Sequence, residues 1–244
     1  MDSKTYEEVK PDEAHGVHYA RIAKLLLEKG ASVEARNEFG STPLIIAAGY
    51  GEDDVAKLIL EKGAHIEATD NEGHTALIAA ACNCPIVDMA DDSVRMLLEH
   101  GADIEARDKQ GGTALMAAAR WGRDRQVQLL LDNGASIDAR DNHGNTALLT
   151  AVSGGGYYPT ADVVRSLLTR GADIDATNDN GDTTLILAAS TGGYEDAKIV
   201  KLLVDHRADP RIRNKQGCTA LGLARKNGRT KTAALLKAAA AKSP

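Results

Sequence analysis

Apolar positions along the chain follow the same two-part pattern six times. Each unit opens with a short alanine-rich run, such as GSTPLIIAA from Gly40, and continues with a run such as LLEHGADIEAR from Leu97. The first run is helix-forming and rich in small alanines, which allow a neighbouring helix to approach closely. In the second part apolar residues recur at helical spacing, as in Val127, Leu130 and Leu131. The pattern therefore predicts two short helices per unit.

The units recur at a regular spacing. Their opening glycines are separated by 33, 38, 33, 37 and 36 residues, which gives a base period of 33 with insertions of 5, 4 and 3. These glycines are Gly40, Gly73, Gly111, Gly144, Gly181 and Gly217. Such a period is typical of a repeat array, in which each unit packs on its neighbours and the molecule grows in one dimension.

The ends of the expected helices carry recognisable signals. A threonine precedes each first run, where its hydroxyl can accept a hydrogen bond from the helix N-terminus. These residues are Thr42, Thr75, Thr113, Thr146, Thr183 and Thr219. Glycine follows the second run in most units, as at Gly134 and Gly171, and fits a left-handed C-cap. Arg207 holds this position in the last unit. It must either adopt a costly positive φ or end its helix differently.

The period and the G-x-T-P-L opening, kept in full around Pro43, resemble the ankyrin repeat, a turn plus two antiparallel helices. The resemblance covers about residues 18–240. It implies an all-α solenoid of about five full repeats with degenerate N- and C-terminal caps. We expect repeats near 37–69, 70–107, 108–140, 141–177 and 178–213. A polar segment (1–17) precedes the repeat domain (18–244), whose C-terminal cap spans 214–244.

Two features depart from the family pattern. In the family a histidine after Thr-Pro-Leu bridges neighbouring turns. Here that position holds Ile45, Ile78, Met116, Leu149, Ile186 and Gly222, so we expect packing to replace those hydrogen bonds. The helix expected from His18 resembles the second helix of a degenerate first repeat. Pro11 and the polar residues before it make an inner partner helix doubtful.

Composition supports this reading. Apolar residues make up 43% of the chain but aromatic residues only 3%, so the core must consist of Ala, Leu, Ile and Val. Three cysteines without framework spacing argue against a disulfide scaffold and favour a reducing, cytoplasmic compartment. There is no apolar run of about 18 residues and no signal-peptide core at the N-terminus, so we expect no membrane association.

Charge is unevenly distributed along the sequence. Residues 207–244 hold ten Lys and Arg against Asp209 alone, a net charge of +9, whereas residues 1–206 carry −15. The acidic body would repel a long polyanion, which argues against nucleic-acid binding. We expect a monomer, or weak salt-sensitive self-association of the basic end on the acidic body.

No catalytic or cofactor motif is present in the sequence. The glycine-rich SGGGYY (153–158) lacks the lysine and hydroxyl of a phosphate-binding loop. His74, Cys82 and Cys84 fall within eleven residues, but their spacing matches no standard zinc site and a fourth ligand is missing. We therefore expect no metal, no cofactor and no enzymatic activity. The repeated Arg-Asp and Arg-Asn dipeptides resemble a polar ladder for a ligand, but we interpret them as structural turn residues.

The few aromatic residues are the candidates for partner binding. Phe39 precedes Gly40 at a turn tip, and Tyr50 and Trp121 occupy equivalent places at the end of a first helix, with Arg120 and Arg123 beside Trp121. In the ankyrin family the turn tips and inner helices line a concave surface that commonly binds proteins. Tyr, Trp and Arg are the residues that most often anchor such interfaces. The sequence therefore predicts a protein-interaction module or scaffold, unless Tyr50 and Trp121 only pack across neighbouring repeats.

The insertions supply three more candidates and a rival function. Tyr157, Tyr158 and Tyr194 lie in segments that exceed the base period, all at the link between the two helices of a repeat. We expect these segments to form an exposed rim that contributes to partner binding. The alternative is a small-ligand binder or enzyme with a pocket between the insertions, for which these tyrosines and Asp196 would be the site.

Overall fold

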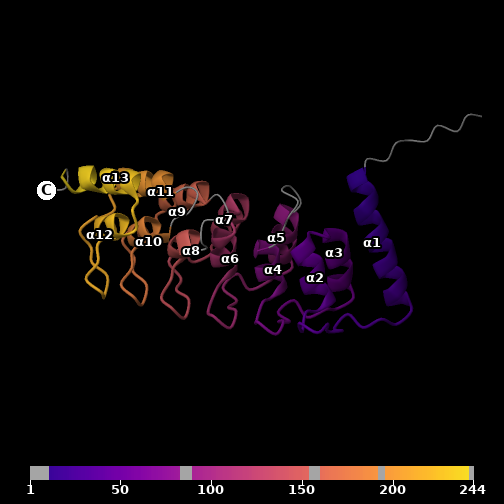
Figure 1. Ribbon diagram of the computed structural model, residues 1–244. Coiled ribbons are helices and arrows are strands. Elements are labelled where there is room, and N and C mark those ends of the chain that lie inside the picture. The colour runs from indigo at the N-terminus through magenta and orange to yellow at the C-terminus, as the bar shows by residue number, and fades with distance from the viewer. Residues whose placement is uncertain (1–10, 83–89, 154–159, 192–195, 242–244) are drawn as a thin grey trace, which may run out of the picture.

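The computed structural model describes residues 11–82, 90–153, 160–191 and 196–241. These ranges contain thirteen α-helices and no strand, apart from an isolated bridge between Thr177 and Thr183. The helices form two rows along the molecule, and hairpin turns extend below one of them (Figure 1). None of the helices in this part of the chain has the length and apolarity needed to cross a bilayer.

The inner row, next to the turns, holds the first helix of each repeat. Its members are α2 (Pro43–Tyr50), α4 (Ala76–Cys82), α6 (Ala114–Arg120), α8 (Ala147–Ser153), α10 (Thr184–Thr191) and α12 (Ala220–Lys226). The outer row holds α1 (Pro11–Glu28), α3 (Asp53–Glu61), α5 (Ala90–Glu99), α7 (Asp124–Asp132), α9 (Ala161–Thr169), α11 (Asp196–Asp205) and α13 (Thr230–Ala240). Each helix packs on the corresponding helix of the next repeat, and from α2 onward each inner helix packs on its own outer helix.

The threonine caps form at all six inner helices. The backbone N–H three residues after each threonine donates to its hydroxyl oxygen, at distances between 3.2 and 3.4 Å. This bond satisfies one of the N–H groups that a helix N-terminus leaves without an intrahelical partner. The prediction from the repeated threonine is therefore confirmed in every repeat.

Left-handed backbone ends the outer helices as expected. A glycine with a φ between +85° and +90° follows α1, α3, α5, α7 and α9, for example +89° at Gly134 and +90° at Gly171. Arg207 takes the same conformation, with a φ of +69°, and is the one non-glycine residue with positive φ in the described ranges. Arg207 therefore adopts the costly positive φ and does not end its helix differently. The turn after the helix is the same as in the earlier repeats.

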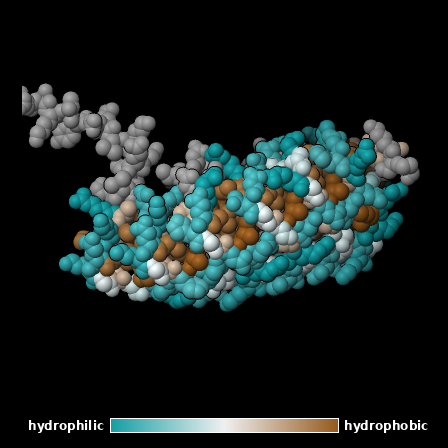
Figure 2. Space-filling view, turned by 180° about the vertical axis from the view of Figure 1, so that it is seen from behind, coloured by the Kyte–Doolittle hydropathy of each residue, from teal (hydrophilic) through white to brown (hydrophobic). Residues whose placement is uncertain are grey.

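One apolar core runs through the array. Buried Leu, Ile, Val and Ala side chains form a continuous cluster from Leu44 to Leu236. The residues that replace the histidine of the family pattern are part of the buried set: Ile45, Ile78, Met116, Leu149 and Ile186 are all at most 5% exposed. Packing thus fills this position in five repeats, as expected, whereas Gly222 at the sixth is exposed. Figure 2, which shows the face opposite to that of Figure 1, has a band of apolar residues along the length of the molecule, between hydrophilic borders.

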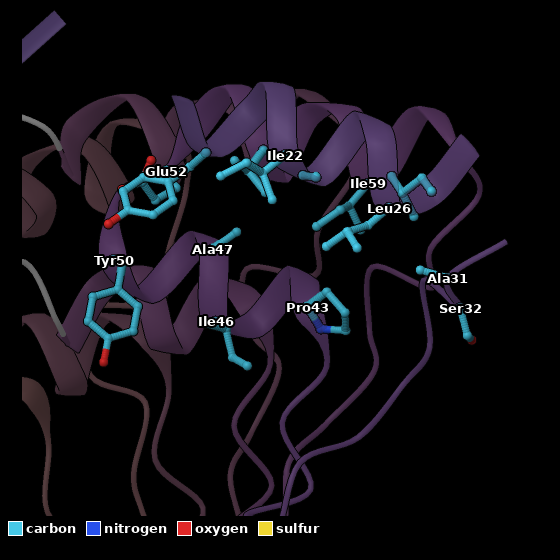
Figure 3. A pocket seen from close by; sticks show the side chains of 14 residues that line it. Ile22, Leu26, Ala31, Ser32, Pro43, Ile46, Ala47, Tyr50, Glu52 and Ile59 are labelled. Carbon is cyan, nitrogen blue, oxygen red and sulfur yellow. The ribbon is translucent and has the colours of Figure 1, made fainter. Parts of the chain in front are cut away.

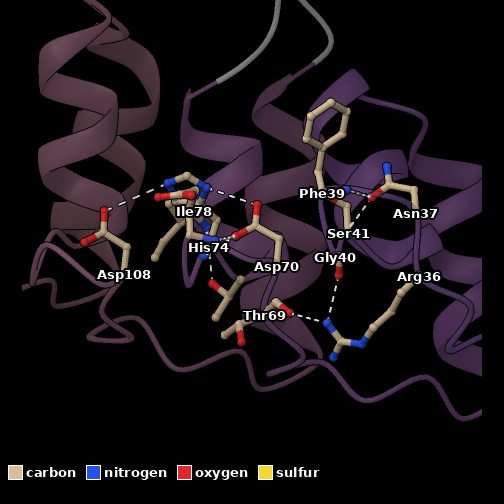
Figure 4. A network of polar contacts seen from close by, with 12 residues as sticks. Arg36, Asn37, Phe39, Gly40, Ser41, Thr69, Asp70, His74, Ile78 and Asp108 are labelled. Carbon is tan, nitrogen blue, oxygen red and sulfur yellow. Dashed lines mark hydrogen bonds and ion pairs between the residues drawn. The ribbon is translucent and has the colours of Figure 1, made fainter.

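The hairpin turns fold on an Asn or Asp side chain. In the first turn, Asn37 Oδ1 accepts hydrogen bonds from the backbone N–H groups of Phe39 and Ser41, at 3.0 and 2.9 Å (Figure 4). The same pair of bonds forms in the five later turns, around Asp70, Asp108, Asp141, Asn178 and Asn214. The interpretation of these positions as structural turn residues is confirmed.

Two kinds of hydrogen bond join each turn to the next. A backbone N–H donates to a carbonyl oxygen of the preceding turn, as Asn71 does to Phe39 at 2.9 Å. A carboxylate accepts from a backbone N–H one repeat further on, as Glu34 Oε1 does from His65 at 2.7 Å. Both bonds recur at all five junctions, where the later carboxylates are Glu67, Glu105, Asp138 and Asp175. They fix the position of each repeat on its neighbour.

Arginine adds a third bond at some junctions. Arg36 Nη1 donates to the carbonyl oxygen of Gly40 in its own turn, at 2.8 Å, and to that of Thr69 in the next (Figure 4). Arg107 and Arg140 bridge two turns in the same way. Three arginines of the repeated dipeptides therefore hold adjacent repeats together, whereas the bond that Arg213 donates to Gly217 stays within its own turn.

The N-terminal helix differs from the sequence expectation. It begins at Pro11, seven residues before the expected start at His18, and has 18 residues where the other outer helices have between 9 and 11. Its second half, 20–28, lies one base period of 33 residues before α3 and corresponds to an outer helix. No inner helix accompanies it among the described residues, so α1 packs on α3.

Candidate protein-binding surface

The turn tips and the inner helices share one side of the array, and Phe39 lies at the first tip. Its backbone N–H is held by Asn37, and its carbonyl oxygen accepts from Asn71 of the next turn. With the backbone fixed from both sides, the ring points away from the polar network and is 66% exposed (Figure 4). Phe39 is therefore a fixed apolar contact point.

Tyr50 and Trp121 end two inner helices. Tyr50 is the last residue of α2 and is 62% exposed, and Gly51 after it caps the helix with a φ of +74°. Trp121 is the C-cap residue of α6, donates its backbone N–H to Ala117, and is 36% exposed. Both keep an exposed part, but Trp121 is covered over most of its surface. Packing within the array therefore buries most of the surface of Trp121 but much less of Tyr50.

Arg120 and Arg123 stand on either side of Trp121. Arg120 is exposed in the last turn of α6, while Arg123 is half-buried at the N-cap position of α7 and makes no side-chain cap bond. The short link between the two helices thus brings two guanidinium groups and one indole to the same corner of the third repeat. Such a group combines the residue types that dominate interface energetics.

The structure does not gather all of these residues into one cluster. Phe39 and Tyr50 lie at opposite ends of α2, which at 1.5 Å per residue is about 12 Å long. Tyr50 and Trp121 lie two repeats apart, roughly 20 Å at a helix spacing of 8–10 Å. Residue 83, the equivalent position between them, is outside the described residues. The surface therefore has separate contact points, with one group around Trp121.

The tyrosines of the insertions lie outside the described residues. Tyr157 and Tyr158 fall between α8 and α9, and Tyr194 falls between α10 and α11, whose first residue is Asp196. Their predicted exposure, and the pocket that they would line, therefore stay predictions. The helix bounds agree with the expectation that each insertion links the two helices of one repeat.

His74 joins two turns. Its Nδ1 lies 3.1 Å from Asp70 Oδ2 in its own turn, and its Nε2 lies 4.0 Å from Asp108 Oδ2 in the next (Figure 4). Sequence reasoning considered His74 as a possible metal ligand and missed this contact. It depends on the stacking of two turns 38 residues apart, and the sequence pattern of one turn does not indicate it.

Cys82 ends α4 and packs against the core. Burial raises the pKa of its thiol to about 11, and the carboxylate of Asp108 acts in the same direction. A cysteine binds metal as the thiolate, which this environment disfavours. No group of three His, Cys, Asp or Glu residues in the described part of the chain could hold a metal ion. Cys84 is outside that part.

A second apolar surface was not predicted. Tyr19, Ile22, Leu25 and Leu26 of α1 are each between 51% and 57% exposed. The signal was present in the sequence, because the outer-helix pattern from His18 has no apolar inner-helix pattern before it.

The fold and this surface define an α-helical solenoid of stacked helix-turn-helix repeats, without a catalytic arrangement among the described residues. The profile of ankyrin repeats matches the chain in three copies, over residues 14–108, 87–178 and 155–243. The chain therefore belongs to the ankyrin repeat family, whose members are typically protein–protein interaction modules and generally non-catalytic. A comparison with curated proteins gives no match.

Proposed function

We propose that this protein is a non-enzymatic interaction module that binds another protein on the side formed by its turn tips and inner helices. The observation that carries the proposal is the corner around Trp121, where an exposed arginine and a half-buried one flank a partly exposed indole. Phe39 and Tyr50 extend the same surface toward the N-terminus. The tyrosines of the insertions, Tyr157, Tyr158 and Tyr194, would add a rim beside it.

Rigidity supports this proposal. Every turn is tied to the next by at least two hydrogen bonds, so the surface is ordered before a partner arrives. Binding then has little ordering entropy to offset, which favours affinity at a given contact area. The guanidinium groups beside Trp121 favour a partner segment that carries carboxylates.

The test begins with the partner itself. A photo-crosslinking amino acid at Phe39, which is 66% exposed, identifies proteins bound in host lysate, and calorimetry with the purified partner then gives the Kd. We expect Arg120→Ala and Trp121→Ala each to weaken binding about tenfold or more, as at interface anchors. Arg165→Ala, on the exposed side of α9, is the matched control and should leave the Kd unchanged.

Stability is measured separately for each variant. Trp121 is mostly covered, so Trp121→Ala also lowers the melting temperature, whereas exposed Arg120→Ala leaves it unchanged. Calorimetry is done well below the lower melting temperature. Unchanged affinity in both variants would show that the partner binds elsewhere.

A further inference from the structure

The N-terminal helix α1 carries apolar residues at positions that are buried in the later repeats, but in α1 these residues are exposed. Leu26 of α1 is 55% exposed. The residues at the same position in α3, α5, α7, α9 and α11 are at most 4% exposed: Ile59, Leu97, Leu130, Leu167 and Leu203. Each of those outer helices packs on the inner helix of its own repeat. No inner helix accompanies α1 among the described residues, and Leu26 stays exposed.

Ile22, one turn earlier, repeats the observation. It is 54% exposed, while its equivalents Ser93, Gln126, Val163 and Ile199 are at most 6% exposed and its equivalent in α3, Val55, is half-buried. Two core positions on one face of α1 therefore lack the neighbour that the repeat provides elsewhere. Exposed apolar groups of this kind, gathered on one face, are typical of a binding groove.

A groove of about 620 Å³ lies between α1, α2 and α3. Figure 3 shows Ile22 and Leu26 pointing from α1 toward Ala47 of α2 across this gap. Ile46, Tyr50 and Pro43 complete its lining from α2, and Val55 and Ile59 from α3. Among the described residues, Glu52 is the one charged residue in the lining, so this lining is apolar along its length and acidic at one end.

The sequence before residues 20–28 does not suit the place of an inner helix in the first repeat. In register with α2, the inner helix of the first repeat would be residues 10–17, which read KPDEAHGV. Pro11 and Asp12 would then occupy the positions of Leu44 and Ile45, which are 1% and 5% exposed. Burying a carboxylate there without a partner costs far more than leaving it in water. The groove therefore has the shape of an inner helix that this sequence does not supply.

We propose that this groove binds an amphipathic helix of a partner protein, in the place of the missing inner helix. The repeat itself sets the shape of that helix: about two turns, with Ala, Leu, Ile or Met on the face toward α1 and α2, as in α6. Basic residues at the end near Glu52 complement that carboxylate and the net charge of −15 of the acidic body. This mode of recognition places i, i+3 and i+4 anchors in an apolar groove.

The probe is an 18-residue helical peptide with the buried positions of α6 on one face and lysine elsewhere, labelled with fluorescein. A peptide of the same composition in scrambled order is its control. Anisotropy with the full chain should show saturable binding of the probe and none of the scrambled peptide. Leu26→Gln should weaken binding about tenfold or more, because an anchor in the groove loses its apolar contact.

Leu25→Gln is the matched control variant. Leu25 lies on the same helix and is 57% exposed, against 55% for Leu26, but it is not part of the groove lining. We expect its Kd to change less than twofold. Circular dichroism should show unchanged helix content in both variants, because both side chains are exposed. Equal effects of the two substitutions, or equal binding of the scrambled peptide, would overturn the proposal.

Two further measurements separate other occupants of the groove. If the protein self-associates in sedimentation and Leu26→Gln abolishes this, the groove binds a second copy and the proposal is wrong. If removal of residues 1–10 strengthens probe binding more than tenfold, the chain's own N-terminal segment occupies the groove, and the proposal is equally wrong. Monomeric protein with unchanged affinity after the removal supports a partner helix.

Discussion

At the scale of single residues, the clearest conflict between sequence and backbone is Arg207. Its φ of +69° is one that side chains with a Cβ rarely adopt, and the equivalent residues in the earlier repeats are glycines with φ near +90°. The left-handed conformation costs roughly 1–2 kcal/mol for a residue other than glycine. The last repeat therefore carries strain that its neighbours do not.

Arg207→Gly should relieve this strain. Part of the gain is offset by the greater freedom of glycine in the unfolded chain, so we expect a net stabilisation of about 0.5–1 kcal/mol. The reciprocal change, Gly134→Ala, should destabilise by about 1 kcal/mol. A Cβ at Gly134 meets nothing within 4 Å, so this cost is one of backbone conformation. Urea unfolding measures both, and a loss of stability in Arg207→Gly would contradict the argument.

At the scale of elements, the junctions between turns decide how the repeats are placed. Arg107 Nη1 donates to the carbonyl oxygens of Gly111 and Arg140, at 3.0 and 2.7 Å, and so ties two turns with one side chain. The equivalent residue in the second repeat is Thr69, which cannot reach two carbonyl groups. Backbone and carboxylate bonds hold that junction without an arginine.

Arg107→Ala should lower the free energy of unfolding by about 1–2 kcal/mol, because two carbonyl groups lose a charged donor. Arg95→Ala, an exposed arginine on α5, provides the comparison and should change it by less than about 0.5 kcal/mol. Urea midpoints with unchanged slope are the measurement. Equal midpoints for the two variants would mean that the hydrogen bonds of Arg107 add nothing to stability beyond what hydrogen bonds to water provide.

Sequence reasoning predicted local features of these elements and missed the contacts between them. The threonine caps, the glycine caps and the Asn or Asp turns are set by residues within four positions of each other, so a repeated pattern suffices to find them. The bonds of Glu34 and His74 cross one repeat, and their partners become neighbours only in the stack. The surface around Trp121 was predicted from residue type and position. The groove beside α1 was not, because it depends on the absence of an inner helix next to α1 among the described residues.

At the scale of the whole molecule, the array is supported unevenly. A repeat with neighbours on both sides is covered by them, but residues 20–28 of α1 pack on α3 with no inner helix of their own in the described part of the chain. In a one-dimensional array stability is the sum of each repeat's own contribution and its interfaces, so an end with fewer contacts opens first. The N-terminal end should therefore open more easily than the middle.

Hydrogen exchange measured by mass spectrometry tests this. Backbone amides in 20–28 should show protection about 100-fold or more below that of α7, which lies between two neighbours, because local opening follows contact density. Binding of the helical probe peptide should raise the protection of 20–28. Equal protection in the two helices would show that α3 alone holds α1 as firmly as a complete repeat.

The hydrogen bonds between turns have a consequence for how this molecule can vary. They lie at one end of each repeat, while the insertions of 5, 4 and 3 residues lie at the other, between α4 and α5, α8 and α9, and α10 and α11. Chain length can thus change at one end without altering the pitch set at the other. Loops grafted between these helix pairs would be variable parts on a constant frame, which makes this chain a natural template for a library of binders.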